Sequence, residues 1–162
     1  MNTLYKKSPV PVALALGSNI GNAQAIFTQA CKLLTDNGFV LDAIAPILIT
    51  QPVDCPVGTP DFSNTALIGS FDGTAEELLT LTQSIEVALG RPADHGFHTS
   101  RTLDLDIILF GNTIMQTARL TLPHPRAQER RFVLEPLAEI APELIFPDTM
   151  QSVRAALDML EK

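Results

Sequence analysis

Apolar positions along the chain alternate between two spacings, which predict strands and helices in turn. A nearly continuous apolar run over residues 10–16 predicts a strand covered on at least one face. Apolar residues at helical spacing follow over residues 22–35, where Asn22 is suited to cap the first turn and Gly38 lies beyond the end. A strand, a short loop and a helix therefore form the opening unit.

Two more strands are expected after this unit. Residues 39–50 predict a second strand, in which Pro46 indicates an edge position or a bulge. Residues 51–60 contain three prolines and a glycine, which predict a long connection. Residues 61–71 predict a third strand, paired with the second across that connection.

A second helix is expected over residues 75–89, since Thr74 and Glu77 form a capping-box pattern. After it, residues 91–100 are polar and irregular and predict another long loop. That loop leads into the most distinctive stretch of the chain, residues 101–111, which predict a strand. With a period of two, its apolar face carries Leu103, Leu105, Ile107 and Leu109, and its other face carries Thr102, Asp104, Asp106 and Ile108.

The C-terminal part predicts less regular structure. Residues 113–122 are expected to return as further strand, and the prolines of residues 123–125 end it. Residues 130–140 predict a short helix. Asp148 is expected to cap a last helix that ends at Leu160.

The resulting β-α-β-β-α-β order predicts a ferredoxin-like, split βαβ fold of the α+β class. We expect an antiparallel sheet with helices on both faces, in three αβα layers. No repeat or linker marks a second domain, so residues 1–162 are expected to form one domain.

Composition restricts the classes of function. The formal net charge is −7, and a chain this acidic is not expected to bind nucleic acid or an anionic membrane surface. The two cysteines, Cys31 and Cys55, lack metal-ligand spacing and favour a reducing compartment. No signal peptide or run of about 18 apolar residues is present, so we expect a cytoplasmic protein.

Asp104 and Asp106 stand on one face of their strand, about 6 to 7 Å apart at the backbone. Two carboxylates at that spacing repel each other when ionised, and a divalent cation relieves the repulsion. Mg²⁺ in particular binds one or two carboxylates together with substrate phosphates. The simpler alternative is the solvent-facing side of an amphipathic strand. Phosphate-binding groups nearby favour nucleotide chemistry; they are Arg91, Arg101, Arg119, Thr121, His124 and Arg130.

Two further pairs are candidates for substrate contacts. Gln83 and Glu86 lie about one helical turn apart, so both can face a cleft, or form a solvent-facing stripe. Phe62 and Asn64 alternate on their strand and can supply a stacking surface and a donor-acceptor pair for a planar heterocycle, although a strand phenylalanine is more often core.

The motifs together resemble the 6-hydroxymethyl-7,8-dihydropterin pyrophosphokinase family of folate biosynthesis. The resemblance covers about residues 13–146, in the family's order and spacing. It rests on the segments LGSN, TQPV, DFSN, TQSIE, RTLDLDIILFG, LTLPHPR and ERRFVLEPLAEIAP.

The resemblance implies transfer of the pyrophosphoryl unit of ATP to the pterin hydroxymethyl group, with AMP as the other product and two Mg²⁺ ions at Asp104 and Asp106. The residues it assigns to catalysis are Arg91, Arg101, Asp104 and Asp106. Those it assigns to ATP are Gln83, Glu86, Arg91, Arg101, Ile107 through its backbone, Arg119, Thr121, His124 and Arg130. Those it assigns to the pterin are Thr50, Pro52, Val53, Phe62, Asn64, His98, Asp104 and Phe132.

One segment departs from the family pattern. Before Arg101 the family usually has Trp-Gly-Pro, and His98 stands at the tryptophan position here. This departure keeps a catalytically impaired paralogue, which binds pterin or nucleotide as a sensor or partner, as the alternative function. A ferredoxin-like RNA-binding or regulatory module fits the topology alone, but the chain lacks a basic face. We expect a monomer that uses small-molecule substrates.

Overall fold

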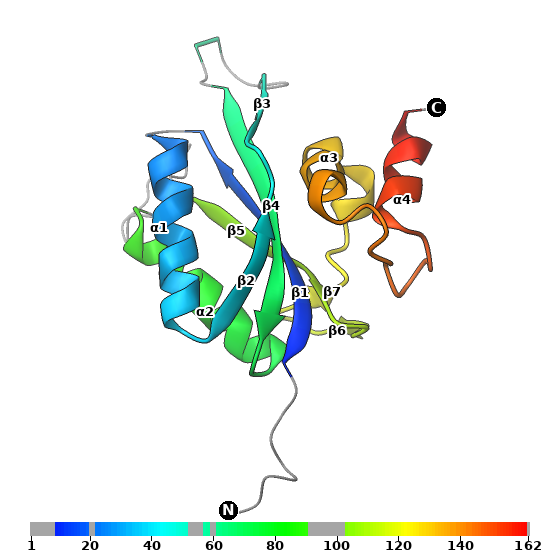
Figure 1. Ribbon diagram of the computed structural model, residues 1–162, viewed down its shortest axis with the longest axis horizontal. Coiled ribbons are helices and arrows are strands. Elements are labelled where there is room, and N and C mark those ends of the chain that lie inside the picture. Colours follow the sequence, from blue (N-terminus) through cyan, green and yellow to red (C-terminus); the bar gives the residue numbers. More distant parts are fainter. Residues whose placement is uncertain (1–8, 20–21, 52–56, 59–60, 91–102, 162) are drawn as a thin grey trace, which may run out of the picture.

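An antiparallel sheet lies between two layers of helices in the computed structural model (Figure 1). The structure describes residues 9–19, 22–51, 57–58, 61–90 and 103–161. The strands are β1 (Val10–Ser18), β2 (Phe39–Ile44), β3 (Leu48–Thr50), β4 (Phe62–Phe71), β5 (Asp104–Phe110), β6 (Met115–Gln116) and β7 (Thr121–Leu122). The helices are α1 (Ala23–Asp36), α2 (Ala75–Ala88), α3 (Arg131–Ile140) and α4 (Val153–Leu160), with a 3₁₀ turn, η2 (Ala127–Glu129), before α3.

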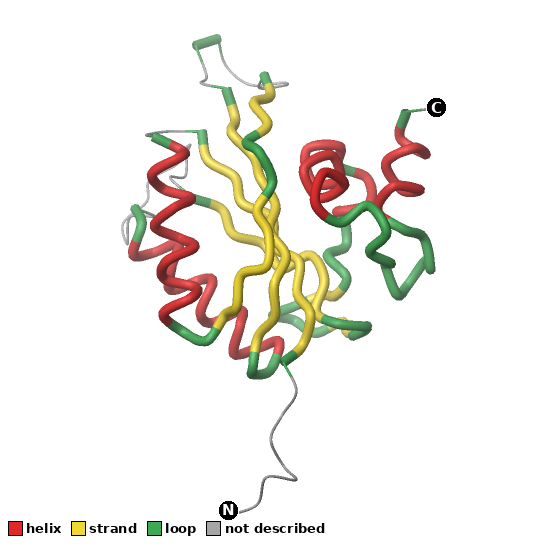
Figure 2. Tube along the Cα trace, viewed as in Figure 1, coloured by secondary structure: helices red, strands yellow, loops and turns green. Residues whose placement is uncertain are grey.

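The strand order confirms the expected ferredoxin-like topology. The main sheet runs β2-β4-β1-β5, β3 also pairs with β4, and every pairing is antiparallel. Because β4 lies between β2 and β1, the two strands that α1 connects are not neighbours, as the split βαβ arrangement requires. Figure 2 shows the strands of this sheet as one twisted layer beside the helices.

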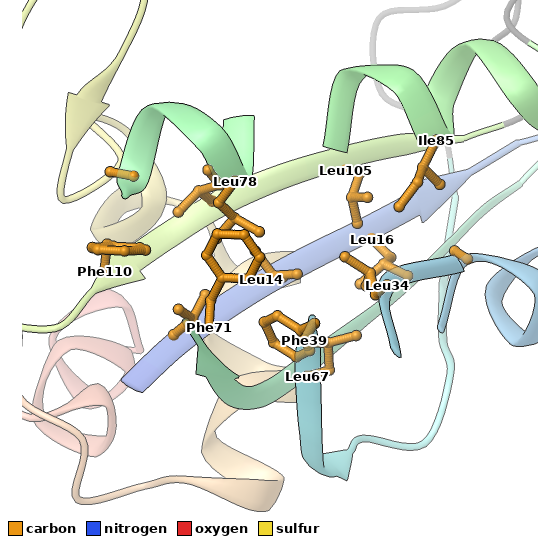
Figure 3. Close-up of a cluster of buried hydrophobic side chains, with 14 of the residues drawn as sticks. Leu14, Leu16, Leu34, Phe39, Leu67, Phe71, Leu78, Ile85, Leu105 and Phe110 are labelled. Carbon is orange, nitrogen blue, oxygen red and sulfur yellow. The ribbon is translucent and has the colours of Figure 1, made fainter. Parts of the chain in front are cut away.

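Each face of the sheet has its own hydrophobic core. On one face, α1 and α2 pack against the sheet around Leu14, Phe39 and Leu78, which we call the α1/α2 core (Figure 3). On the other face, α3 and α4 pack around Ala13, Ala15 and Leu134, which we call the α3/α4 core. The expected three-layer αβα architecture is therefore confirmed. None of the helices in the described ranges has the length and apolar content needed to cross a membrane.

Both predicted helix starts in the first half of the chain are confirmed. The Asn22 side chain accepts a hydrogen bond from the backbone N–H of Ala25 at 3.2 Å. Thr74 and Glu77 form the complete capping box, in which each side chain accepts from the backbone N–H of the other residue. These local signals locate the helices because they satisfy amide groups that a helix start leaves unpaired.

The predicted strands beside the sheet's edges needed correction. Residues 39–50 form two strands rather than one, with the break at Pro46, whose missing N–H cannot join a ladder. Residues 113–122 do not extend the main sheet. They form the small β6–β7 pair, closed by a hydrogen bond from the backbone N–H of Thr117 to the carbonyl of Leu120 at 2.9 Å.

A register shift corrects the predicted faces of β5. The pairing with β1 shifts between Ala13 and Leu14, whose partners are Leu109 and Ile107. The extra residue, Ile108, turns Leu109 away from the face of Leu105 and Ile107, so Leu109 belongs to the α3/α4 core. Strict alternation along the whole strand was therefore wrong beyond Ile107.

The predicted cap of the last helix was also wrong. Ser152, not Asp148, caps α4 by accepting from the backbone N–H of Ala155 at 3.0 Å. Asp148 instead accepts from the backbone N–H of Thr149 and from the side-chain amide of Gln128. The chain between them forms a turn closed by the bridge between Ile145 and Ser152, so a helix can begin only after that bridge.

Candidate active site

The two aspartates lie on the α3/α4 face of the sheet. In the β1–β5 register Asp104 pairs with Gly17 and Asp106 with Ala15, which belongs to the α3/α4 core. Directly paired residues project to the same face, so both carboxylates share it. Asp104 is half-buried and Asp106 is exposed. The predicted strand face for this pair is confirmed.

The residues expected at the pterin lie across β1 from the aspartates. Gly17 pairs with Asp104 on one side and with Asn64 of β4 on the other. Thr50 of β3 pairs with Phe62 of β4, and the Asn64 side-chain amide lies 3.4 Å from the Thr50 hydroxyl. Asn64 is only 8% exposed. One row of the sheet thus places an amide and a carboxylate on either side of a glycine, and the Thr50 hydroxyl lies beside the amide from another row.

The first turn of α3 contributes the next pair. Phe132 is 40% exposed, and the guanidinium carbon of Arg130 lies 5.6 Å from the centre of its ring. Helix α3 packs against β4 and β3, the strands that carry Asn64 and Thr50. A residue assigned to ATP and a residue assigned to the pterin are therefore in contact, on the same face as the aspartates.

His124 lies near Asp106, and hydrogen bonds hold its backbone N–H and one of its ring nitrogens. Its backbone N–H donates to the carbonyl of Ile108 at 2.9 Å, which attaches it to the outer edge of β5. Its Nδ1 accepts from the backbone N–H of Arg126 at 3.2 Å, so the neutral ring carries its proton on Nε2. Burial lowers the pKa of His124; Asp106 opposes this shift, and Arg130 and Arg126 add to it. The ring is therefore a neutral donor at pH 7.

Gln83 and Glu86, which the sequence analysis placed on one face of a helix, differ in exposure on α2. Gln83 is exposed, whereas Glu86 is 7% exposed and its Oε2 accepts from the backbone N–H of Leu105 at 2.8 Å. Arg119 lies along the exposed side of α2, with one guanidinium nitrogen 3.4 Å from the Thr80 hydroxyl. Gln83 and Arg119 thus lie on the exposed side of α2, where Arg119 also pairs with Glu76 at 3.9 Å, whereas Glu86 faces β5.

Two more residues assigned to ATP, Ile107 and Thr121, are placed so that a backbone group or a hydroxyl can contact a ligand. The Ile107 side chain is buried in the α1/α2 core, so its backbone is the part that a ligand can reach. Thr121 is half-buried in β7, which packs against β5. Five predicted site residues lie outside the described residues, and their assignments stay predictions: Pro52, Val53, Arg91, His98 and Arg101.

The donor set fits Mg²⁺. Asp104 and Asp106 supply hard carboxylate oxygens, which this ion prefers, beside groups suited to phosphate. Within the described residues no group of three or more His, Cys, Asp and Glu side chains is arranged to hold a metal ion. Two protein carboxylates together with ligand phosphates are the usual way in which a protein binds Mg²⁺.

Sequence reasoning assigned no role to two residues at this site. Arg126 lies close enough to His124 to lower its pKa, and its position directly after the His-Pro pair was the available signal. Gly17 stands between Asn64 and Asp104, and a Cβ there would lie 3.2 Å from the Asn64 Oδ1. Only the strand register reveals its place, since nothing nearby in the sequence does.

The family model and the curated relatives that match this chain point to the same family. Residues 13–142 match the family model described as 7,8-dihydro-6-hydroxymethylpterin-pyrophosphokinase. A Bacillus subtilis protein named 2-amino-4-hydroxy-6-hydroxymethyldihydropteridine pyrophosphokinase is 41% identical over 132 residues, which cover 81% of this chain and 78% of the relative. The Pseudomonas aeruginosa protein of the same name is 37% identical, over 85% of this chain and 84% of the relative.

Other relatives are longer than this chain. A folate synthesis bifunctional protein of Arabidopsis thaliana is 36% identical over 80% of this chain, which spans 26% of that relative. The crystal structure of wild-type Plasmodium falciparum HPPK-DHPS superposes with a TM-score of 0.74 at 12% identity, over 96% of this chain and 44% of that one. The likeness to that structure supports the fold.

Proposed function

Because the chain belongs to the 7,8-dihydro-6-hydroxymethylpterin-pyrophosphokinase family, we propose that its reaction takes place on the α3/α4 face of the sheet, around Asp104 and Asp106. The enzyme transfers the pyrophosphoryl group of ATP to the hydroxymethyl group of 6-hydroxymethyl-7,8-dihydropterin in folate synthesis. The observation that supports this location is the sheet row in which Gly17 joins Asn64 to Asp104.

The pterin binds on the Asn64 side of that row. Asn64 offers both a donor and an acceptor to the heterocycle, and Thr50 orients it. Phe62 and Phe132 provide apolar ring surfaces from β4 and α3. Pro52, Val53 and His98 complete the predicted pterin set. The hydroxymethyl group then points across Gly17 towards Asp104, close to both substrates.

The triphosphate binds on the side of the aspartates and α2. Arg119, Arg130, Thr121 and the Nε2–H of neutral His124 donate hydrogen bonds to phosphate oxygens, and the Ile107 backbone and Gln83 bind the nucleoside end. The family uses ATP and generally requires Mg²⁺. We place two Mg²⁺ ions at Asp104 and Asp106, where they would neutralise phosphate charge.

Catalysis follows from orientation and charge. Asn64, Phe62 and Phe132 orient the hydroxymethyl oxygen, while Arg119, Arg130 and His124 hold the transferred group in line with it. Arg91 and Arg101, from the segment before β5, add charge stabilisation to the leaving AMP. The substrates are ATP and the pterin alone. The alternative of an impaired binding paralogue has no support from the comparisons.

The decisive experiment measures AMP release from ATP, with and without the hydroxymethyl-dihydropterin, in Mg²⁺ and in EDTA. Asp104→Ala and Asp106→Ala should each reduce pterin-dependent AMP release by about a hundredfold or more, because each removes a Mg²⁺ ligand. Asp158→Ala removes an exposed carboxylate of α4 and serves as the matched control. Wild-type protein that binds the pterin yet releases no AMP would overturn the assignment.

Three whole-chain properties complete the proposal. Residues 1–162 form a single pyrophosphokinase domain, which the uninterrupted five-stranded sheet and its two flanking cores support. The enzyme acts as a monomer in the cytoplasm. The acidic net charge of −7 is consistent with a chain that binds neither nucleic acid nor anionic membrane.

A further inference from the structure

We propose that Arg126 is a further phosphate-binding residue, which contacts the transferred pyrophosphoryl group of ATP together with Arg130 and His124. The inference rests on the proposed function, because it concerns the group that the enzyme transfers. The family resemblance assigned no role to Arg126. The observation that carries the inference is a pair of arginines beside His124 that form no ion pair with a carboxylate of the described residues.

The other arginines that the structure describes do have carboxylate partners. Their ion pairs, with nitrogen–oxygen distances of 3.9 Å or less, are Arg119–Glu76, Arg131–Glu135, Arg131–Glu161 and Arg154–Asp158. Aspartate and glutamate outnumber lysine and arginine by 18 to 11, so carboxylates are plentiful in this chain. Two neighbouring guanidinium groups that lack one indicate a place for an anionic ligand.

Both arginines flank the short 3₁₀ turn η2. Arg126 directly precedes the turn and Arg130 directly follows it. The backbone N–H of Arg130 donates to the carbonyl of Ala127 at 3.2 Å, and the N–H of Ala127 donates to the carbonyl of His124 at 3.3 Å. Ala127 is fully buried in the α3/α4 core. The backbone that carries the two arginines and His124 is therefore compact and anchored.

Gln128 fixes the same turn from its other side. Its side-chain Nε2 donates to Asp148 Oδ1 at 3.2 Å, and its Oε1 accepts from the Thr149 hydroxyl at 2.8 Å. Both ends of the amide are thus bonded to the turn before α4. Because η2 is held by these bonds and by buried Ala127, the chain positions around Gln128 are set before a ligand arrives, which lowers the cost of ordering them on binding.

The electrostatics of His124 place both guanidinium groups near one ring. Burial is the largest cause of its lowered pKa, and the charges of Arg130 and Arg126 lower that pKa further, against Asp106. Both cations therefore lie within electrostatic range of the imidazole. A phosphate that accepts from the Nε2–H of His124 lies in the field of both arginines, and its negative charge relieves their mutual repulsion.

The guanidinium group of Arg126 can be removed without releasing His124. The bond that fixes the tautomer comes from the backbone N–H of Arg126, which donates to His124 Nδ1 at 3.2 Å. An alanine at this position keeps that N–H, and the Arg126 side chain is exposed rather than packed in a core. Arg126→Ala is therefore a specific test of the charge and of its hydrogen-bond donors.

The first test compares the binding of ATP and of AMP, each in Mg²⁺ and without the pterin, by isothermal titration calorimetry. Arg126→Ala should raise the Kd for ATP by about tenfold or more and leave the Kd for AMP within about twofold, because AMP lacks the transferred group. Arg154→Ala makes the same change in net charge on α4 and is the control. A Kd for ATP that changes no more than in the control would refute the proposal.

The second test uses the pyrophosphorylated pterin product, because the transferred group remains on it. Arg126→Ala should weaken the binding of this product in Mg²⁺ by about fivefold or more, yet leave the affinity for the hydroxymethyl-dihydropterin within about twofold. An unchanged affinity for the product would overturn the assignment to the transferred group. An equal loss for both pterins would also overturn it, because the effect would then not depend on phosphate.

The conservative variant keeps the proposal testable if Arg126→Ala does not fold. Arg126→Lys retains the charge but not the planar fork, so it should raise the Kd for ATP by about threefold and leave that for AMP unchanged. In that case a wild-type Kd for ATP in Arg126→Lys would refute the proposal. A wild type that binds ATP but releases no pterin-dependent AMP would instead refute the proposed function.

Discussion

At the scale of single residues, His124 shows how neighbours select one form of a side chain. Its Nδ1 accepts from the Arg126 backbone, so the neutral tautomer presents Nε2–H to a ligand. Burial is the first cause of its lowered pKa, and the nearby Arg130 and Arg126 guanidinium groups contribute, against the opposing charge of Asp106. The sequence identified His124 as a phosphate contact, but its protonation depends on residues that meet only in the fold.

This shift has a consequence for stability. Since the folded pKa of His124 lies below 6.5, the unfolded chain binds a proton first as the pH falls. The free energy of unfolding should therefore decrease as the pH falls through 6.5 towards the folded pKa of His124. The slope against pH that this group contributes corresponds to at most one extra proton bound by the unfolded chain. His124→Gln should lose that component.

The measurement is denaturant unfolding of both proteins in EDTA at about pH 7.5 and pH 5.5. Other titrating groups are common to the two proteins, so their difference isolates His124. Equal pH dependence in the wild type and in His124→Gln would contradict the role assigned to burial and to the two arginines.

At the scale of elements, β1 is the strand on which the site depends. Its C-terminal half pairs with β4 on one side and β5 on the other, so Gly17 separates the Asn64 amide from the Asp104 carboxylate. The space above Gly17 exists because it has no side chain. A Cβ there would lie 3.2 Å from the Asn64 Oδ1, which is tight enough to displace that amide.

Gly17→Ala should therefore raise the KM for the pterin by about three- to tenfold, the effect of weakening about one hydrogen bond, while the KM for ATP changes little. Steady-state kinetics with each substrate varied in turn makes this comparison. In an Asn64→Ala background the same substitution should have almost no further effect on the pterin KM, because its target is gone. An equal rise in both KM values would refute the specific effect on Asn64.

Local signals predicted some elements well and others poorly. The caps at Asn22 and Thr74 were predictable because a cap is a bond between residues three apart in the sequence. Asp148 has the same chemistry but does not cap, since the Ile145–Ser152 bridge holds its segment in a turn and α4 begins after Ser152. The position of Leu109 could not be predicted either, because a bulge depends on the partner strand as well as on its own residues.

At the scale of the whole molecule, the exposed edge of β2 bears on oligomeric state. Val40 is 58% exposed on this strand, and an open edge of this kind can pair with a second copy. Two features oppose such pairing: the register of β2 shifts between Leu41 and Ala43, and the residue at that bulge is the exposed Asp42. The edge is thus both bent and charged.

We therefore expect sedimentation velocity to give the mass of one chain at micromolar concentration. A mass of two chains would contradict the proposed monomer. Val40→Lys would then identify the interface, since a second charge on β2 should dissociate a dimer formed through this edge and leave any other dimer intact.

The sequence by itself determined the order of the elements, the ferredoxin-like fold class and the family, because these follow from local periodicity, capping chemistry and motifs read along the chain. Only the tertiary structure decided which residues meet. The row from Asn64 through Gly17 to Asp104, and the bond from Leu105 to Glu86, join segments far apart in the sequence. Strand register and helix packing set such contacts, and both are properties of pairs of elements that neither element specifies alone.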